Sequence, residues 1–217
     1  MDNSFEQRDR FKELVGPIRE LFYAYGLKNL SMDELSRRLG ISKKTLYTYV
    51  RNKEELIELV LLNEESTILK VSADIDKLPV NAIEKLLKMS ELMHEEMKRY
   101  NPIILFEMEK YFHQVYEAYF EKKRKYVFDG MKRNILQGIE EKVYRDDINV
   151  DLVATIYLNS FIELHNSDFC KMLDINFVQL FEVIFENHIR AISTPVGVAY
   201  FESRKKEIVE YINSIKK

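Results

Sequence analysis

The chain has 217 residues, of which 46% are hydrophobic and 32% charged, and its formal net charge is -3. This composition predicts a globular protein with one sizeable core or two small ones, and it excludes a disordered chain. The single cysteine, Cys170, excludes an intrachain disulfide. The charged N-terminal segment indicates no signal peptide, and the uncharged runs are too short to span a bilayer, so we expect a cytoplasmic protein.

Apolar residues recur at spacings of three and four in the segment before residue 26, which predicts a helix. The stripe consists of Phe11, Leu14, Val15, Ile18, Leu21, Phe22 and Tyr25. Pro17 lies inside it. An interior proline removes a backbone hydrogen bond and clashes with the preceding turn, so we expect a kink or a restart between Glu13 and Pro17.

The next stretch, residues 31–56, reads SMDELSRRLGISKKTLYTYVRNKEEL and predicts a helix-turn-helix followed by the start of another helix. Ser31 and Glu34 have the spacing of a capping box, in which each side chain accepts the other's backbone N–H. Gly40 stands where the first helix would end in a left-handed residue. Ser42 can cap a second helix that runs to about Tyr49, after a turn of about four residues.

Charge distinguishes this stretch from an ordinary helical hairpin. From Arg37 to Lys53 there are six basic residues and no acidic one, whereas residues 57–217 carry 22 basic and 27 acidic residues. Such a local excess is typical of a nucleic-acid-binding surface, although a solvated basic face is the alternative. We predict base contacts from Lys43, Lys44, Thr45 and Thr48, and phosphate contacts from Ser31, Tyr47, Tyr49 and Lys53.

The residues from Leu14 to Leu56 resemble the TetR (tetracycline-repressor) family of transcription regulators. The resemblance rests on the Leu21–Phe22 pair before Gly26 and then on Gly40, Ile41, Ser42, Thr45, Leu46, Tyr47, Tyr49, Asn52, Lys53 and Leu56. The sequence departs from the family's usual pattern at Pro17, Ser36, Lys44 and Val50. The resemblance implies an all-α homodimeric repressor that binds palindromic double-stranded operator DNA and is controlled by a small-molecule effector.

We expect two domains: a helix-turn-helix DNA-binding domain at residues 1–52, and a helical effector-binding and dimerisation domain at 53–217. Asn52 and Glu55 form a capping signal for a connector helix over 53–75. The later pattern predicts helices at about 80–100, from Pro102 onward and at about 112–136, a polar loop at 138–149, and a final helix opened by Thr194 and Pro195. This last helix would either cover the body or extend a dimer contact.

Two wide apolar stripes, near residues 153–164 and 177–192, exceed what a single body easily buries. They predict a four-helix interface between two subunits, with purely intrachain packing as the alternative. The candidate interface residues are Ile156, Phe161, Phe177, Phe181, Ile184, Phe185 and His188.

The sequence shows no metal-ligand spacing, no phosphate-binding loop and no nucleophile motif, so we expect neither a cofactor nor catalysis. The family resemblance implies an effector pocket in the body, for an apolar or amphipathic ligand. Its candidate lining is Met89, Met93, Met97, Phe106, Phe112, Tyr116, Tyr119, Phe120, Tyr157 and Phe161, although such residues are also ordinary core. Two other functions compete with regulation: a helical small-molecule-binding or interaction protein, and a helical enzyme.

Overall fold

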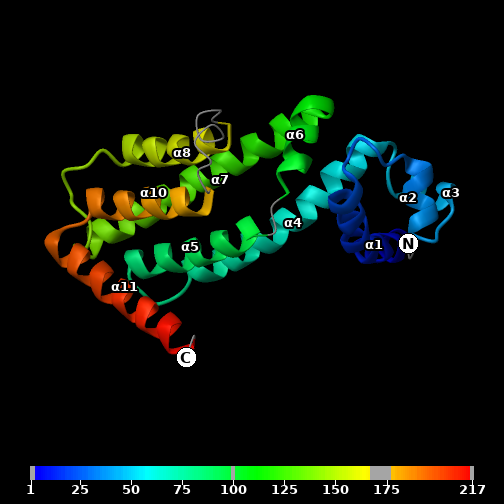
Figure 1. The fold of residues 1–217 in the computed structure, drawn as a ribbon. Coiled ribbons are helices and arrows are strands. Elements are labelled where there is room, and N and C mark those ends of the chain that lie inside the picture. The colour runs from blue at the N-terminus through cyan, green and yellow to red at the C-terminus, as the bar shows by residue number, and fades with distance from the viewer. Residues whose placement is uncertain (1–2, 99–100, 167–176, 216–217) are drawn as a thin grey trace. The chain divides into compact units, whose positions relative to one another are not determined.

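The computed structural model describes residues 3–98, 101–166 and 177–215. Within them the chain is helical, apart from loops and one isolated antiparallel bridge between Tyr144 and Ser193. The helices are α1 (Asn3–Tyr25), α2 (Met32–Arg38), α3 (Lys43–Tyr49), α4 (Lys53–Asp76), α5 (Ala82–Lys98), α6 (Pro102–Tyr111), α7 (His113–Glu140), α8 (Val150–Asn166), α10 (Phe177–Ile192) and α11 (Pro195–Ile215). Figure 1 shows their order along the ribbon. The predicted all-α class is confirmed.

The helices form two compact units. The first unit comprises Met1–Ala73 and Tyr100–Lys123, and the second comprises Asp74–Arg99 and Arg124–Lys217. The boundary between them falls inside α4 and α7. These units have other boundaries than the predicted domains 1–52 and 53–217. The predicted domains divide the chain by function, and that division stays a prediction.

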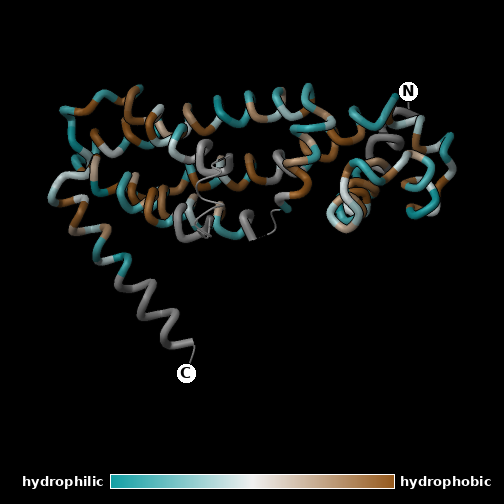
Figure 2. Tube along the Cα trace, turned by 45° about the horizontal axis from the view of Figure 1, so that its top comes forward, coloured by the Kyte–Doolittle hydropathy of each residue, from teal (hydrophilic) through white to brown (hydrophobic). Residues whose placement is uncertain are grey.

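The first unit is built on a core to which α1, α2, α3, α4 and α6 all contribute. Ile18, Leu35, Leu46, Leu56 and Met108 are completely buried in it. Figure 2 shows how apolar and polar segments alternate along the helices, as expected when each helix turns one side to a core. The apolar stripe of residues 11–25 therefore lies on a helix, as predicted, and Val15, Ile18 and Phe22 of this stripe are buried in the core.

Pro17 does not interrupt α1, so of the kink or restart expected between Glu13 and Pro17 the restart is wrong, and the kink stays a prediction. The helix runs continuously from Asn3 to Tyr25 with Pro17 inside it and exposed to solvent. Two features explain this tolerance. Gly16 has no Cβ for the proline ring to meet, and Val15 and Ile18 are buried on either side, which holds both halves of the helix on the core.

The second unit packs α10 against α8, α5 and α11. The start of the final helix is fixed by a buried carboxylate. Glu84 of α5 accepts hydrogen bonds from the Arg204 guanidinium at 2.8 and 3.0 Å and from the Tyr200 hydroxyl at 3.1 Å. Phe201 is buried in the same core. The first part of α11 thus covers the body of its own chain.

Several predicted boundaries are displaced. Helix α5 starts at Ala82, two residues after the predicted start, and it is described as far as Lys98. Helix α7 continues to Glu140, beyond the predicted end at residue 136. Gly138, predicted to open a loop, lies in the last turn of α7. There it is covered by the buried ring of Tyr144, whose hydroxyl donates to the Asn134 side chain at 3.2 Å. The chain turns back only after Lys142, which has a φ of 60°.

A Gly138→Ala substitution tests this packing. A Cβ at residue 138 would collide with the Tyr144 ring, whereas a Cβ at Gly130 of the same helix meets nothing closer than the Arg133 guanidinium at 3.8 Å. We expect Gly138→Ala to lower the free energy of unfolding by about 2 kcal/mol, as overpacking does, and Gly130→Ala to leave it unchanged or raise it by up to about 1 kcal/mol. Urea unfolding followed by circular dichroism measures both, and equal effects would contradict the packing described.

Candidate nucleic-acid interface

The two helices of the helix-turn-helix are positioned by caps that the sequence predicted. The Ser31 hydroxyl accepts the backbone N–H of Glu34 at 3.1 Å, and the Ser42 hydroxyl accepts that of Thr45 at 3.0 Å. Gly40 has a φ of +68°, the left-handed conformation expected after the first helix. The reciprocal half of the Ser31 capping box does not form, because the Glu34 carboxylate bonds to the guanidinium groups of Arg37 and Arg38, which lower its pKa.

Helix α3 buries Leu46 and turns a polar face to solvent. Lys43, Lys44 and Thr48 are exposed, as predicted, and Tyr47 is 43% exposed. The Thr45 hydroxyl lies 2.8 Å from that of Ser42. Tyr49, a predicted phosphate contact, is half-buried with its ring centroid 5.4 Å from that of Phe11.

Acidic neighbours balance much of the basic window. Lys43 Nζ lies 2.5 Å from the Asp33 carboxylate, whose hydrogen bond raises the pKa of Lys43. Arg51 pairs with Glu55 at 3.1 Å, as Arg37 and Arg38 pair with Glu34. All these groups are wholly or partly exposed, so the pairs are weak and a phosphate can replace the carboxylate. Lys44 makes no ion pair within the described part of the chain.

The start of α4 carries the third predicted cap, in which the Asn52 side chain accepts the Glu55 backbone N–H at 2.8 Å. Lys53 follows it and is half-buried. Its ammonium lies 3.5 Å from the Lys28 carbonyl and 5.6 Å from the centre of the Phe112 ring. Burial lowers the pKa of Lys53, and the nearby Glu107 carboxylate opposes this shift.

Side chains at the start and along α6 contact α1 and the turn after it, within the first unit. The sequence did not predict these contacts. The Asn101 amide donates to the Tyr23 carbonyl at 3.2 Å, and Lys28 Nζ lies 3.2 Å from the Tyr111 hydroxyl, lowering the pKa of Tyr111. Glu107 bonds to the backbone of the turn between α1 and α2. These partners are about 80 residues apart in sequence, so no local pattern could have revealed them.

The predicted effector-pocket residues fall into both units. Phe106, Phe112, Tyr116, Tyr119 and Phe120 belong to the first unit, and Met89, Met93 and Tyr157 to the second. The side chains of Met97 and Phe161 lie outside the described residues. Tyr116 and Tyr119 contact Phe120 with ring centroids 4.5 and 5.3 Å apart, whereas Phe106 is 57% exposed.

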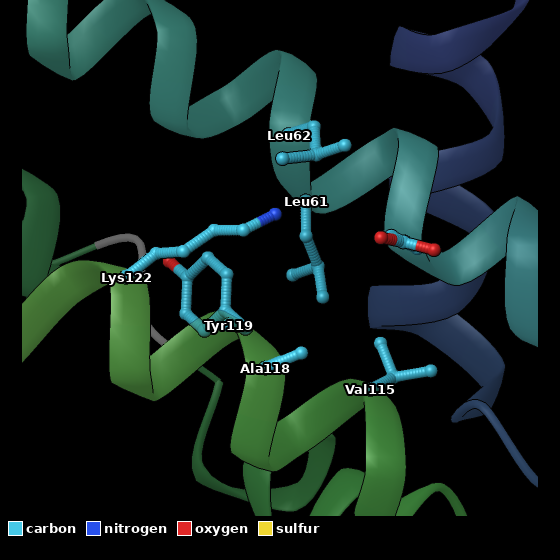
Figure 3. A pocket seen from close by; sticks show the side chains of 7 residues that line it. Leu61, Leu62, Val115, Ala118, Tyr119 and Lys122 are labelled. Carbon is cyan, nitrogen blue, oxygen red and sulfur yellow. The ribbon is translucent and has the colours of Figure 1, made fainter.

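A depression in the first unit lies between α4 and α7, and of the predicted pocket residues only Tyr119 lines it. The rest of the lining is Glu58, Leu61, Leu62, Val115, Ala118 and Lys122. Figure 3 shows the Lys122 side chain reaching from α7 toward Leu61 and Leu62 of α4, beside the Tyr119 ring. The surface thus combines an apolar lining with one ammonium and one carboxylate.

The predicted interface residues divide into exposed and buried ones. Ile156 of α8 is 66% exposed, and so are most of the side chains of Leu152 on the same helix and Val183 on α10. Phe185 and His188 of α10 are instead buried in the second unit. The His188 and Tyr157 rings are 4.5 Å apart, and burial lowers the pKa of His188 to about 4. Ile184 is half-buried. The side chains of Phe161, Phe177 and Phe181 lie outside the described residues.

Over the described ranges, no three His, Cys, Asp or Glu side chains come together as a metal site. No described helix combines the length and the apolar character needed to cross a membrane.

Comparison with known proteins bears directly on the helix-turn-helix. Residues 18–60 match the family model of bacterial regulatory proteins of the tetR family. The HTH-type transcriptional regulator YvaF of Bacillus subtilis strain 168 is 24% identical over 145 residues, which cover 65% of this chain and 74% of that protein.

Solved structures share the fold over most of the chain. A TetR transcription regulator from Haloarcula marismortui superposes with a TM-score of 0.71 at 16% identity, covering 86% of this chain and 100% of that one. The ketosteroid transcriptional regulator KstR2 of Mycobacterium tuberculosis gives 0.53 at 18% identity, covering 85% and 95%. At such identities these structures show the common fold alone. The helix-turn-helix of this chain is thus that of the bacterial regulatory proteins of the tetR family, and the rest of the chain shares the fold of these solved structures.

Proposed function

We propose that this regulator is a ligand-responsive repressor that binds a palindromic operator as a homodimer. Residues 1–52 form its DNA-binding domain, and residues 53–217 its effector-binding and dimerisation domain. The exposed polar face of α3 is the observation that carries the proposal. Lys43, Lys44 and Thr48 reach base edges in the major groove, and Ser31, Tyr47 and Lys53 contact phosphates.

Dimerisation is supported by the exposed apolar residues of two helices in contact. Leu152 and Ile156 on α8 and Val183 on α10 are each more than half exposed. A contiguous apolar patch across two packed helices would be a candidate subunit interface, and we propose that these residues belong to one. The buried Phe185 and His188 support these helices from within the subunit. In a two-fold dimer, two recognition helices spaced about 34–36 Å apart would read a palindrome.

We place the effector at the depression between α4 and α7, which has room for about one water as it stands and would have to widen for a larger ligand. Its four aliphatic side chains, flanked by Glu58 and Lys122, suit an amphipathic effector. Such an effector would act as an inducer if it bound preferentially to a form with a different spacing of the recognition helices, with a coupling free energy of ~1–3 kcal/mol. Catalysis forms no part of this function.

Selection from random duplex DNA at ~150 mM salt tests the proposal. Wild type should enrich a palindrome whose half-sites lie about one helical turn apart. Ile156→Glu, which places a charge on the proposed dimer face, should enrich only a single half-site, and Leu136→Glu, at an exposed position of α7, should behave as wild type. Lys43→Ala should keep the half-site spacing and relax base preference at particular positions. No enriched motif with wild type would contradict DNA regulation and favour a binding protein without a regulatory role.

Removing the carboxylate that pairs with Lys43 should strengthen DNA binding. Asp33→Asn leaves Lys43 without its partner and takes a negative charge away from the start of α2. We expect the Kd for the selected duplex to fall a few-fold at ~100 mM salt, and the gain to shrink as salt rises because these charges are screened. Asp129→Asn, at an exposed position of α7, is the control for net charge. Equal changes in the two variants would show that Asp33 has no local effect.

A further inference from the structure

Glu107 of α6 is a buried carboxylate that accepts hydrogen bonds from the backbone of the turn between α1 and α2. Its side chain accepts the backbone N–H groups of Leu27 and Lys28, the latter at 3.1 Å, in the turn between α1 and α2. The residue is only 8% exposed, and Ile104 and Met108 beside it belong to the apolar core. A buried carboxylate is tolerated only when it is hydrogen-bonded, so these two N–H groups account for its presence there.

Gly26 makes room for this contact. After its φ of +80°, the N–H groups of Leu27 and Lys28 both donate to one oxygen of the Glu107 carboxylate. A Cβ at residue 26 would lie 2.8 Å from one Glu107 oxygen and 3.0 Å from the other. The glycine and the carboxylate therefore fit one another, and changing either one should disturb the same contact.

The turn held by Glu107 leads directly into proposed phosphate-binding residues. Three residues after Lys28, Ser31 caps α2, and the Lys28 carbonyl lies 3.5 Å from the Lys53 ammonium at the start of α4. Asn101 ties the start of α6 to α1 through the Tyr23 carbonyl. Helix α6, which lies outside the helix-turn-helix, thus fixes the α1–α2 turn. This turn leads into the start of α2 and contacts the start of α4.

We propose that Glu107 is a positioning residue for DNA binding, which holds the α1–α2 turn so that Ser31 and Lys53 can contact phosphates together. This role rests on the proposed function of those two residues. It differs from a purely structural role, in which Glu107 would only add to the stability of the first unit.

Two substitutions that keep the net charge test the role. Glu107→Asp withdraws the carboxylate by one methylene, and Gly26→Ala displaces it from the other side. Electrostatic attraction to DNA is then unchanged in both variants. Glu109→Asp, at an exposed carboxylate of the same helix, is the matched control. The readouts are the Kd for the duplex selected by wild type, the dependence of Kd on salt, the thermal midpoint, and amide exchange at Leu27 and Lys28.

We expect Glu107→Asp to raise the Kd about tenfold, to speed exchange at Leu27 and Lys28, and to leave the rest of the first unit protected. The salt dependence of Kd should weaken, because fewer phosphates are held at once. In a double-mutant cycle, Gly26→Ala and Glu107→Asp should raise the Kd by less than the product of their separate effects, since both disturb one contact. Gly26→Ala also strains the backbone at its φ of +80°, so its own effect should exceed the part that it shares with Glu107→Asp. Glu109→Asp should match wild type.

The proposal is overturned if Glu107→Asp binds the duplex as tightly as wild type although Leu27 and Lys28 exchange faster. It is also overturned if affinity falls only in proportion to the loss of folded protein, or if the two substitutions add fully. If wild type itself binds no duplex, the proposed DNA function fails and this role fails with it, whereas wild-type binding with an unaltered variant overturns the role alone.

Discussion

The first unit depends on the burial of one leucine each from α2, α3 and the start of α4. Helices α2 and α3 have seven residues each, too few to be stable alone. Leu35, Leu46 and Leu56 are completely buried against α1 and α6, and this packing holds both helices in place. Because the inner face supplies the stability, the outer face of α3 is free to carry the lysines, threonines and tyrosine that we propose contact DNA.

The electrostatics of this surface follow from the same arrangement. Most of its cations are paired with carboxylates three to ten residues away, at exposed positions where ion pairs are weak. Such pairs orient Lys43 and Arg51 without binding them tightly, so exchange for phosphate oxygens costs little. Glu107 is different, since it is buried and bonded to the backbone. The surface thus combines replaceable ion pairs with one fixed internal contact.

Local patterns predicted local features well and distant contacts not at all. The caps at Ser31 and Ser42, the left-handed Gly40 and the exposed face of α3 depend on residues within four positions of one another, so spacing alone revealed them. Pro17 showed the limit of a local rule, because packing by Val15 and Ile18 kept the helix intact. The end of α7 was missed because Tyr144 covers Gly138, and Glu107 was missed because its partners lie 79 and 80 positions away.

The most direct test of this account is amide hydrogen exchange of the full chain with and without the selected duplex. If α3 reads bases while the starts of α2 and α4 hold phosphates, exchange should slow at residues 31–34, 42–49 and 52–56, and should change less on the outer surfaces of α8 and α10. Protection confined to residues 74–99 and 124–217, with none in α3, would contradict the assignment of the helix-turn-helix as the DNA-reading surface.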